Sequence, residues 1–344
     1  ADLASFVALK QSQGYTVSKV TTATTGSTKD QIKAYIAAQY ASATPPSFVL
    51  FVGDTDKIPN WNFVSSGETS YLTDLYYVTM DGSSDYVPDI YRGRFPVRNT
   101  TQLANMVNNA QWYHQTSGAE PWVKKAAFLA TDDSGNYQTA EGTHNYCINT
   151  YTQPRGYSGI FPNNPQPGGD KLYAITYSAN TTNVTNSIND NRVMVVYSGH
   201  GSQTSWAGPS FTQTNVRNLT GVPSAYVVGH ACVTADFNTA EAFSDTWVIQ
   251  PNKGALVYVG ASDNSYWDED DRLQRTMFDT LYASPDTYVP SISEMLYAGL
   301  ASVQQTYPSS GRYYWEEYNL FGDPSTTIVL APKYPDFRLA VSPS

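Results

Sequence analysis

Two apolar segments of the chain end in side chains that could act together in catalysis. The segment VMVVYSGHG (193–201) ends in His200 and Gly201, and AYVVGHAC (225–232) ends in Cys232. Their separation suits one strand–helix–strand crossover, which would bring both to the carboxyl edge of a parallel sheet, where ligands bind. An imidazole beside a thiol can take its proton and make it a nucleophile. The N–H groups of Gly201 and Cys232 could then hold a substrate oxyanion.

The remaining cysteine and histidines have plainer interpretations. A buried cysteine usually behaves as a small apolar side chain, and we apply that interpretation to Cys147, in the middle of an expected helix. His114 and His144 also lie on expected helices, where we expect a surface or structural role. His230 is two residues before Cys232, so strand alternation places it on the same face, as a wall of any pocket there.

Carboxylates follow two further strand candidates. Asp132 and Asp133 end KKAAFLATDD (124–133), where a carboxylate could orient the imidazole and stabilise its cationic form. A helix N-cap or turn pair is the alternative. The run YWDEDD (266–271) could form a pocket for a cation, with an aromatic wall and a carboxylate at its base. Its alternative is a solvated helix N-terminus, where acids interact favourably with the helix dipole.

The stretch DGSSDYVPD (81–89) offers oxygen ligands at regular positions. It contains Asp81, Asp85 and Asp89, with the Val87 carbonyl between the last two. Hard oxygen ligands of this kind predict a structural Ca²⁺ site, although the spacing is not that of an EF-hand and a polar hairpin loop is the alternative. The sequence has no His, Cys and carboxylate set typical of a catalytic zinc site. We therefore expect catalysis without a cofactor.

The elements that must position these residues alternate between helix and strand. Apolar spacing predicts helices at 2–13, 28–42, 100–116, 136–151, 180–190, 212–217, 237–249 and 269–283. It predicts strands at 15–22 and 47–54, the second buried on both faces, and in KKAAFLATDD, KLYAITYS, RVMVVYSGHG, SAYVVGHAC and GALVYVGAS. This alternation predicts an α/β fold, a mostly parallel sheet covered by helices. The pattern breaks at 117–122, which predicts subdomains at 1–120 and 121–332, followed at 333–344 by the start of a truncated β module.

Length and composition exclude several classes of protein. At roughly 150 residues per domain, 344 residues suggest two domains or one large α/β unit. The net charge of −10 argues against a sequence-independent nucleic-acid binder, which needs a basic surface. No apolar run reaches the length of about 18 residues that spans a membrane, and two cysteines cannot build a disulfide scaffold. The low charged fraction of 15% and the 27 tyrosines are commoner in exported proteins.

Ordered segments along nearly the whole chain resemble the gingipain family of cysteine peptidases, within the caspase-like clan. The segments are FVGDTDKIP (51–59), DIYRGRF (89–95), GHGSQTSWAGPS (199–210), HACVTADF (230–237), VGASDNSYWDED (259–270) and YYWEEYNLFGDPS (313–325). The resemblance implies a caspase-like three-layer fold in two adjacent subdomains, the first without catalytic residues. The family's first strand would precede the helix at 2–13, and we expect that processing has removed it.

The resemblance also implies roles for individual residues. His200 matches the general base, Cys232 the nucleophile, and Asp133, with Asp132 as the fallback, the carboxylate that supports the base. The acidic run is most similar to that of the lysine-specific gingipains, which places Asp270 at the substrate lysine. The same pocket would be lined by Tyr266, Trp267, Ser198 and His230. The loop at 81–89 looks like a calcium loop of the same gingipains, with Asp54 as an extra ligand.

His230 departs from the family pattern, which has an amide side chain at this position. A protonated histidine would repel a substrate cation, whereas a neutral one could accept its hydrogen bond. The strictness of lysine selection therefore depends on the charge of this ring.

We therefore expect a secreted or cell-surface cysteine endopeptidase that cuts proteins or peptides after basic residues, in particular Lys. We expect no nucleic-acid partner and no membrane span, and we expect the chain to come from a longer multidomain precursor. Two alternatives stay open. One is a peptidase of the same clan with Arg or Asn specificity, and the other is a surface or secretion module that keeps the fold without turnover.

Overall fold

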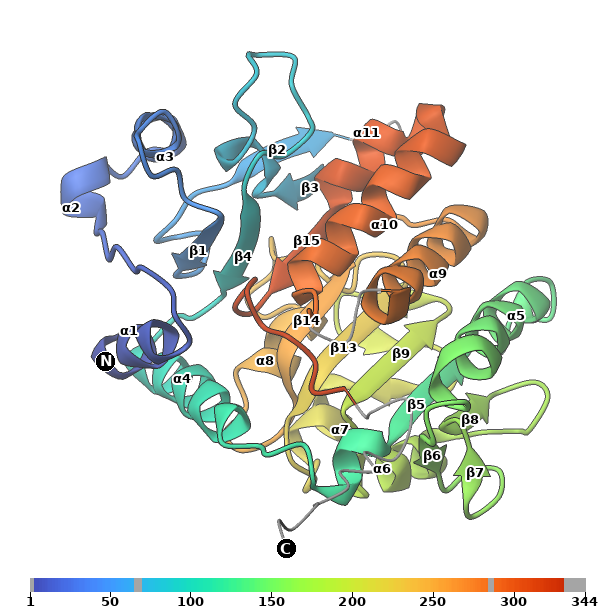
Figure 1. The fold of residues 1–344 in the computed structure, drawn as a ribbon. Coiled ribbons are helices and arrows are strands. Elements are labelled where there is room, and N and C mark those ends of the chain that lie inside the picture. The colour runs from blue at the N-terminus through green and yellow to red at the C-terminus, as the bar shows by residue number, and fades with distance from the viewer. Residues whose placement is uncertain (1–2, 65–69, 284–287, 331–344) are drawn as a thin grey trace, which may run out of the picture.

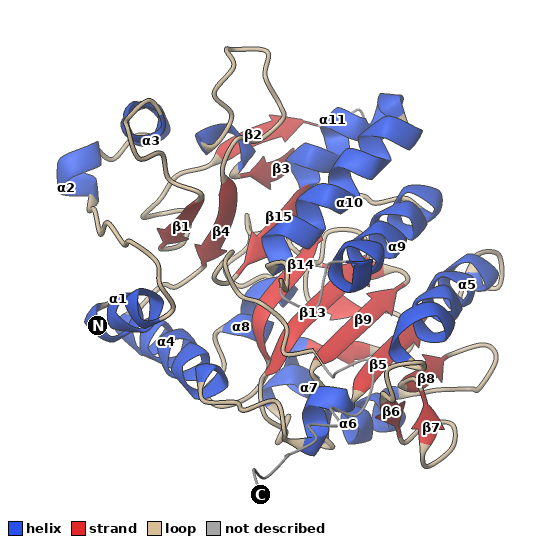
Figure 2. Ribbon diagram, viewed as in Figure 1, coloured by secondary structure: helices blue, strands red, loops and turns tan. Residues whose placement is uncertain are grey.

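A computed structural model describes residues 3–64, 70–283 and 288–330, and it is built around an eight-stranded sheet (Figures 1 and 2). In spatial order the strands are β1 (Phe48–Val52), β4 (Tyr91–Phe95), β15 (Tyr318–Phe321), β14 (Ala255–Ala261), β13 (Ser224–His230), β9 (Met194–Ser198), β5 (Ala126–Ala130) and β8 (Asp170–Tyr173). Neighbouring strands are parallel except β14 and β15. The predicted mostly parallel sheet is confirmed.

Helices cover both faces of this sheet because its central strands are apolar on both faces (Figure 1). In β9, Met194 and Val196 belong to one core, and Val195 and Tyr197 belong to the other. The first core is covered by α5 (Tyr137–Cys147), α9 (Trp267–Ala283), α10 (Ile292–Thr306) and α11 (Pro308–Glu317). The second is covered by α1 (Ala4–Ser12), α4 (Thr100–His114), α6 (Thr181–Asn189), α7 (Gln213–Arg217) and α8 (Phe243–Val248). The three layers agree with the predicted architecture.

The N-terminal part contributes two strands to one side of the sheet. Its β4 meets β15 through the register pair Arg94 and Phe321. It also contains α2 (Thr22–Thr25), α3 (Lys29–Tyr40), the hairpin of β2 (Trp61–Val64) and β3 (Ser70–Thr73), and η1 (Leu75–Tyr77). The boundary expected at 117–122 falls between α4 and η2 (Pro121–Lys124), within a continuous sheet. The β module expected at 333–344 lies outside the described residues.

Two strand predictions in this part were wrong. The alternating segment at 15–22 is not a strand: residues 15–21 have no regular structure and Thr22 begins α2. Its side chains are exposed or half-buried, so alternation here does not reflect a buried sheet face. The strand at 47–54 exists as β1, but it lies at the edge of the sheet and is mostly half-buried instead of covered on both faces.

Shorter elements complete the C-terminal part of the chain. They are η3 (Ile148–Thr152), β6 (Ser158–Gly159), β7 (Gln166–Pro167), β10 (Gly201–Ser202), β11 (Ser205–Trp206) and β12 (Phe211–Thr212). The last three form a small sheet directly after His200. Within the described ranges, no helix combines the length and the apolar character needed to span a bilayer.

Candidate active site

Three neighbouring strands end beside one another at the carboxyl edge of the sheet. In the parallel register, Ser198 of β9 pairs with His230 of β13 on one side and with Ala130 of β5 on the other. The chain continues past these residues to His200, Cys232 and Asp133 respectively. The sheet therefore brings the predicted base, thiol and carboxylate to one edge, where open α/β sheets bind ligands.

Asp133 both shapes a turn and contacts the imidazole. Its Oδ2 lies 3.0 Å from His200 Nε2 and accepts a hydrogen bond from Asn136 Nδ2 (2.9 Å), and its Oδ1 accepts the N–H of Gly135 (2.7 Å). The bonds from Asn136, Gly135 and His200 lower the pKa of Asp133 to about 2. The carboxylate is therefore ionised at neutral pH. Asp133, rather than the fallback Asp132, is the acid that contacts His200.

The thiol of Cys232 is held apart from the imidazole in this state. Both residues are described, and no hydrogen bond joins them; Sγ donates to the carbonyl of Ser265 at 3.7 Å. Burial raises the pKa of Cys232, so the thiol is protonated at neutral pH and needs a base. The His200 ring meets Trp267 edge to face, with centroids 5.5 Å apart. Catalytic hydrogen bonds commonly tighten only when a substrate binds.

The backbone around the thiol is constrained on both sides. Val233 has φ 52°, a left-handed conformation that costs a β-branched residue on the order of 1–3 kcal/mol. Its N–H donates to the carbonyl of Asp263 (2.9 Å), which holds this conformation. A Cβ on Gly201 would lie 2.8 Å from the Cys232 carbonyl oxygen. The glycine therefore lets the two predicted oxyanion-binding backbones approach each other closely.

The predicted cation pocket lies at the first turn of α9. Asp270 is 6% exposed, and its Oδ1 accepts hydrogen bonds from the hydroxyls of Tyr318 (2.6 Å) and Tyr314 (3.2 Å). Burial raises the pKa of Asp270 to about 7. Ser198 is buried beside His230, as the strand register requires. Strand pairing and the Tyr318 hydroxyl therefore link Ser198, His230 and Asp270.

The surroundings of His230 determine the charge of its imidazole ring. The ring is buried, and burial lowers its pKa to about 3, so it is neutral at physiological pH. Its Nδ1 lies 3.3 Å from the Tyr318 hydroxyl, which itself donates to Asp270. A neutral ring does not repel a cation. Trp267 is half-buried and contacts the His200 ring, and Tyr266 is exposed.

Two tyrosines and a glutamate of this pocket were not predicted as site residues. Tyr314 and Glu317 come from α11 and Tyr318 begins β15. They reach the pocket because β15 runs antiparallel to β14, with Tyr318 paired to Ala261. The segment YYWEEY was part of the resemblance, but its residues carry no local signal that places them beside Asp270.

A second cysteine–histidine pair lies in the core and cannot reach a substrate. His144 and Cys147 are both 0% exposed on α5, where Gln274 Nε2 lies 3.0 Å from His144 Nδ1 and 3.4 Å from Cys147 Sγ. Burial raises the pKa of Cys147 to about 12 and lowers that of His144 to about 4. Both are neutral structural groups, as expected. His114 is exposed and contacts Gln13.

The loop at 81–89 does not gather its carboxylates into a calcium site. Asp85 accepts the N–H groups of Asp81 (3.0 Å) and Val87 (2.9 Å), and Asp89 accepts that of Met80 (2.7 Å). Within the described residues, no group of three or more His, Cys, Asp or Glu is placed to hold a metal ion. The carboxylates close the loop on itself, which is the alternative of a polar loop.

Asp54, the predicted extra ligand, contacts an arginine away from this loop. Its carboxylate lies 2.7 Å from Arg98 Nε, and the same guanidinium reaches Asp245 of α8 at 3.0 Å. Asp54 follows β1, whereas Asp89 precedes the parallel β4, so the two lie at opposite strand ends. Arg98 therefore uses Asp54 to join the N-terminal part to the catalytic half.

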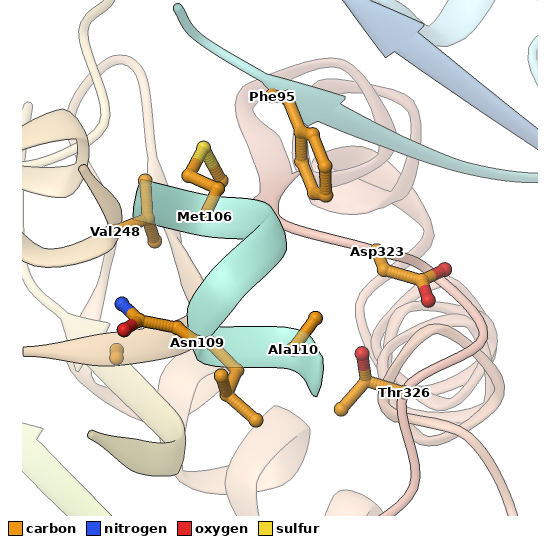
Figure 3. Close-up of a pocket in the computed structure, with 9 residues that line it drawn as sticks. Phe95, Met106, Asn109, Ala110, Val248, Asp323 and Thr326 are labelled. Carbon is orange, nitrogen blue, oxygen red and sulfur yellow. The ribbon is translucent and has the colours of Figure 1, made fainter. Parts of the chain in front are cut away.

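Two hollows lie away from these residues, at the opposite end of the strands. The one in Figure 3 has a volume of about 10 Å³ and lies between α4 and the start of β14, lined in part by Phe95, Met106 and Val248. A larger one, of about 410 Å³, lies beside α1 and α4. Both include Leu256, near the start of β14, whereas the candidate site follows the strand's end. Neither belongs to the candidate site.

Comparisons with known proteins agree with this geometry. The model of peptidase family C25 matches residues 1–329. Lys-gingipain of Porphyromonas gingivalis is 31% identical over 352 residues, covering 92% of this chain and 19% of the relative. Gingipain R2 of the same organism is 24% identical, covering 88% of this chain and 40% of the relative. The crystal structure of the Arg-specific proteinase gingipain R superimposes with a TM-score of 0.80 at 21% identity, over 96% of this chain and 76% of that one. The chain thus spans less than half the length of these curated relatives.

Proposed function

This chain belongs to peptidase family C25, and from that premise we propose that it is a cysteine endopeptidase that cleaves after basic residues, preferentially Lys. The observation that carries the proposal is the meeting of three strand ends. His200, bonded to Asp133 at 3.0 Å, follows the strand next to the one that leads to Cys232, and the acid Asp270 is buried.

In the proposed mechanism Cys232 is the nucleophile. His200 takes the thiol proton, because the buried thiol is protonated before reaction. The thiolate attacks the scissile carbonyl, and the N–H groups of Gly201 and Cys232 stabilise the oxyanion. His200 then protonates the leaving amine, and water hydrolyses the acyl-enzyme with His200 again as the base. Asp133 holds the ring in one orientation and stabilises its cationic form.

Lys selection is proposed to come from Asp270. An ammonium group entering the pocket would meet a buried carboxylate, with Trp267 beside its alkyl stem and a neutral His230 nearby. A compact ammonium fits a deep acid more readily than the planar guanidinium fork does. The 31% identity to Lys-gingipain supports Lys over the alternatives of Arg and Asn.

The wider context of the chain is also a proposal. We infer that it acts outside the cell or at its surface, as part of a longer multidomain protein, on protein or peptide substrates. The low charged fraction supports an exported protein, and the share of the relatives that the chain spans supports a longer parent. The alternative of an inert module is disfavoured, because the base, the carboxylate and the thiol are all in place.

Alkylation of the thiol separates an enzyme from an inert module. Iodoacetamide should label Cys232 faster in the parent than in His200→Ala, because the base supplies the thiolate. The parent should also cleave lysyl peptides, and Cys232→Ala should not. Equal labelling rates in both proteins, together with no peptide cleavage, would leave the module as the better description.

A further inference from the structure

The pocket beside Cys232 holds a carboxylate whose role the proposed mechanism does not use. Glu317 ends α11 and is 0% exposed. Among the residues that the structure describes, none donates a hydrogen bond to either oxygen of its carboxylate. An ionised carboxylate without a partner is strongly disfavoured in a protein interior. Such a group is either protonated or completed by a cation that comes from outside the chain.

Contacts of Glu317 and of the residue that follows it place Glu317 near Asp270. Its carbonyl accepts the N–H of Ser262 (2.9 Å), directly after β14, and the next residue, Tyr318, donates to Asp270. Burial raises the pKa of the Glu317 carboxyl, and the nearby charges of Asp270, Asp263 and Cys232 raise it further. Glu317 is therefore buried near enough to Asp270 and Cys232 for their charges to act on it.

Several buried acids elsewhere in the fold are paired with arginine side chains. Asp170 lies 2.6 Å from Arg192, and Asp74 lies 2.7 Å from Arg94. The neighbouring Glu316 is bonded by Arg312 (2.9 Å) and by two tyrosines. In the described part of the chain, no ion pair neutralises Asp270 or Glu317. The missing positive charge at this place points to a ligand that supplies it.

We propose that Glu317 is a second specificity-determining acid, and that the substrate ammonium lies between the carboxylates of Asp270 and Glu317. This inference rests on the function proposed above and adds a residue to it. An ammonium has three N–H donors. Oδ1 of Asp270 already accepts two tyrosine hydroxyls, so the unpartnered oxygens of Glu317 supply the further acceptors.

The test compares reagents that differ only in the charge of the side chain before the reactive group. Cys232 is alkylated by a peptidyl lysyl chloromethyl ketone, by its norleucyl analogue, and by iodoacetamide. Glu317→Gln should slow the lysyl reagent roughly 10- to 100-fold, as expected for losing a hydrogen bond to a charged group. The norleucyl and iodoacetamide rates should stay near those of the parent. Glu317→Asp should retain more lysyl preference than Glu317→Gln, because it keeps the charge.

Glu316→Gln is the matched control, since it removes the adjacent buried acid, which has its own partners. It should keep the parent's lysyl preference. A lysyl preference that is unchanged in Glu317→Gln, or an equal loss with the lysyl and norleucyl reagents, would overturn the inference in favour of a purely structural acid. If Glu317→Gln fails to fold, a lysyl preference unchanged in Glu317→Asp would overturn it, since a shorter acid should bind less well. A parent that does not prefer the lysyl over the norleucyl reagent would instead overturn the proposed function itself.

Discussion

Replacing Asp270 by Asn removes a single charge from the proposed substrate site. The amide has nearly the shape of the carboxylate and can still accept the hydroxyl of Tyr318, which bonds Asp270 at 2.6 Å. Because Asp270 is only 6% exposed, a bound ammonium would lose a desolvated partner, at about 3–5 kcal/mol. This corresponds to a fall of roughly 10²- to 5 × 10³-fold in kcat/KM for lysyl peptides. Iodoacetamide should still label Cys232 at the parent rate.

The same residue gives the reaction a pH dependence. Burial raises the pKa of Asp270 from 3.8 to about 7, so the free pocket gains a proton as the pH falls through that value. KM for lysyl peptides should therefore rise below about pH 7 in the parent but not in Asp270→Asn. The native carboxyl binds a proton more tightly than the unfolded chain does. Stability is thus lost as the pH rises between the two pKa values, and the Asn variant should lack this loss.

The measurement that tests the role of Asp270 is a peptide library profile of the parent, Asp270→Asn and Asp271→Asn. Asp271 is the next acid on α9, but it is paired with Arg275 on the surface of the helix (2.7 Å). Exposed pairs of this kind are worth about 0.3–0.5 kcal/mol, so its loss should leave the profile nearly unchanged. Equal parent rates after Lys and Arg would refute the Lys assignment. A profile unaltered in Asp270→Asn would return the acidic run to a helix-terminus role.

Three further predictions concern catalysis, the acidic loop and the joint between the two halves. Cys232→Ala should abolish cleavage at an unchanged melting temperature. Cys147→Ala should keep its activity and lose about 1 kcal/mol of stability. An inactive but folded Cys147→Ala would contradict the choice of Cys232 as the nucleophile. A chelator should leave the melting curve unchanged, because the carboxylates of the loop at 81–89 accept hydrogen bonds from its own backbone. Bound calcium at a hundredfold excess over its Kd would add about 2.7 kcal/mol to the free energy of unfolding. A clear fall of the melting temperature in chelator would therefore support the calcium site. Arg98→Ala should lower the free energy of unfolding, measured in urea, by about 3 kcal/mol, because it leaves two buried carboxylates uncompensated. An unchanged midpoint of the urea transition would show that the ion pairs contribute no stability.

The residues at the carboxyl edge of the sheet could be predicted from the sequence because the strands that lead to them are completely buried. Strands covered on both faces are continuous apolar runs, so β9 and β13 could be located, and their ends marked His200 and Cys232 without any contact information. The pair Asp132 and Asp133 was found for the same reason, as the acids after β5, and the family resemblance favoured Asp133. The sequence could not show that one carboxylate serves both the turn at Gly135 and the imidazole.

The failures share a physical cause, which is that burial depends on distant partners. The segment at 15–22 alternates like a strand but has no neighbouring strand, so it remains irregular. β1 is as apolar as a central strand but lies at the edge of the sheet. The tyrosines around Asp270 arrive through the return of β15 beside β14, a pairing that no local pattern encodes. Asp54 is held by an arginine that follows the next strand of the sheet.

The contrast between the two cysteines gives the chain an internal reporter of its own folding. One thiol is half-buried at a strand end and the other is completely enclosed in the core. The native protein should therefore consume one equivalent of a thiol reagent promptly, and the second only when the core around α5 opens. Timed titration of the slow equivalent would measure how often that core opens, and titration of the fast one would count competent active sites in a preparation without any substrate.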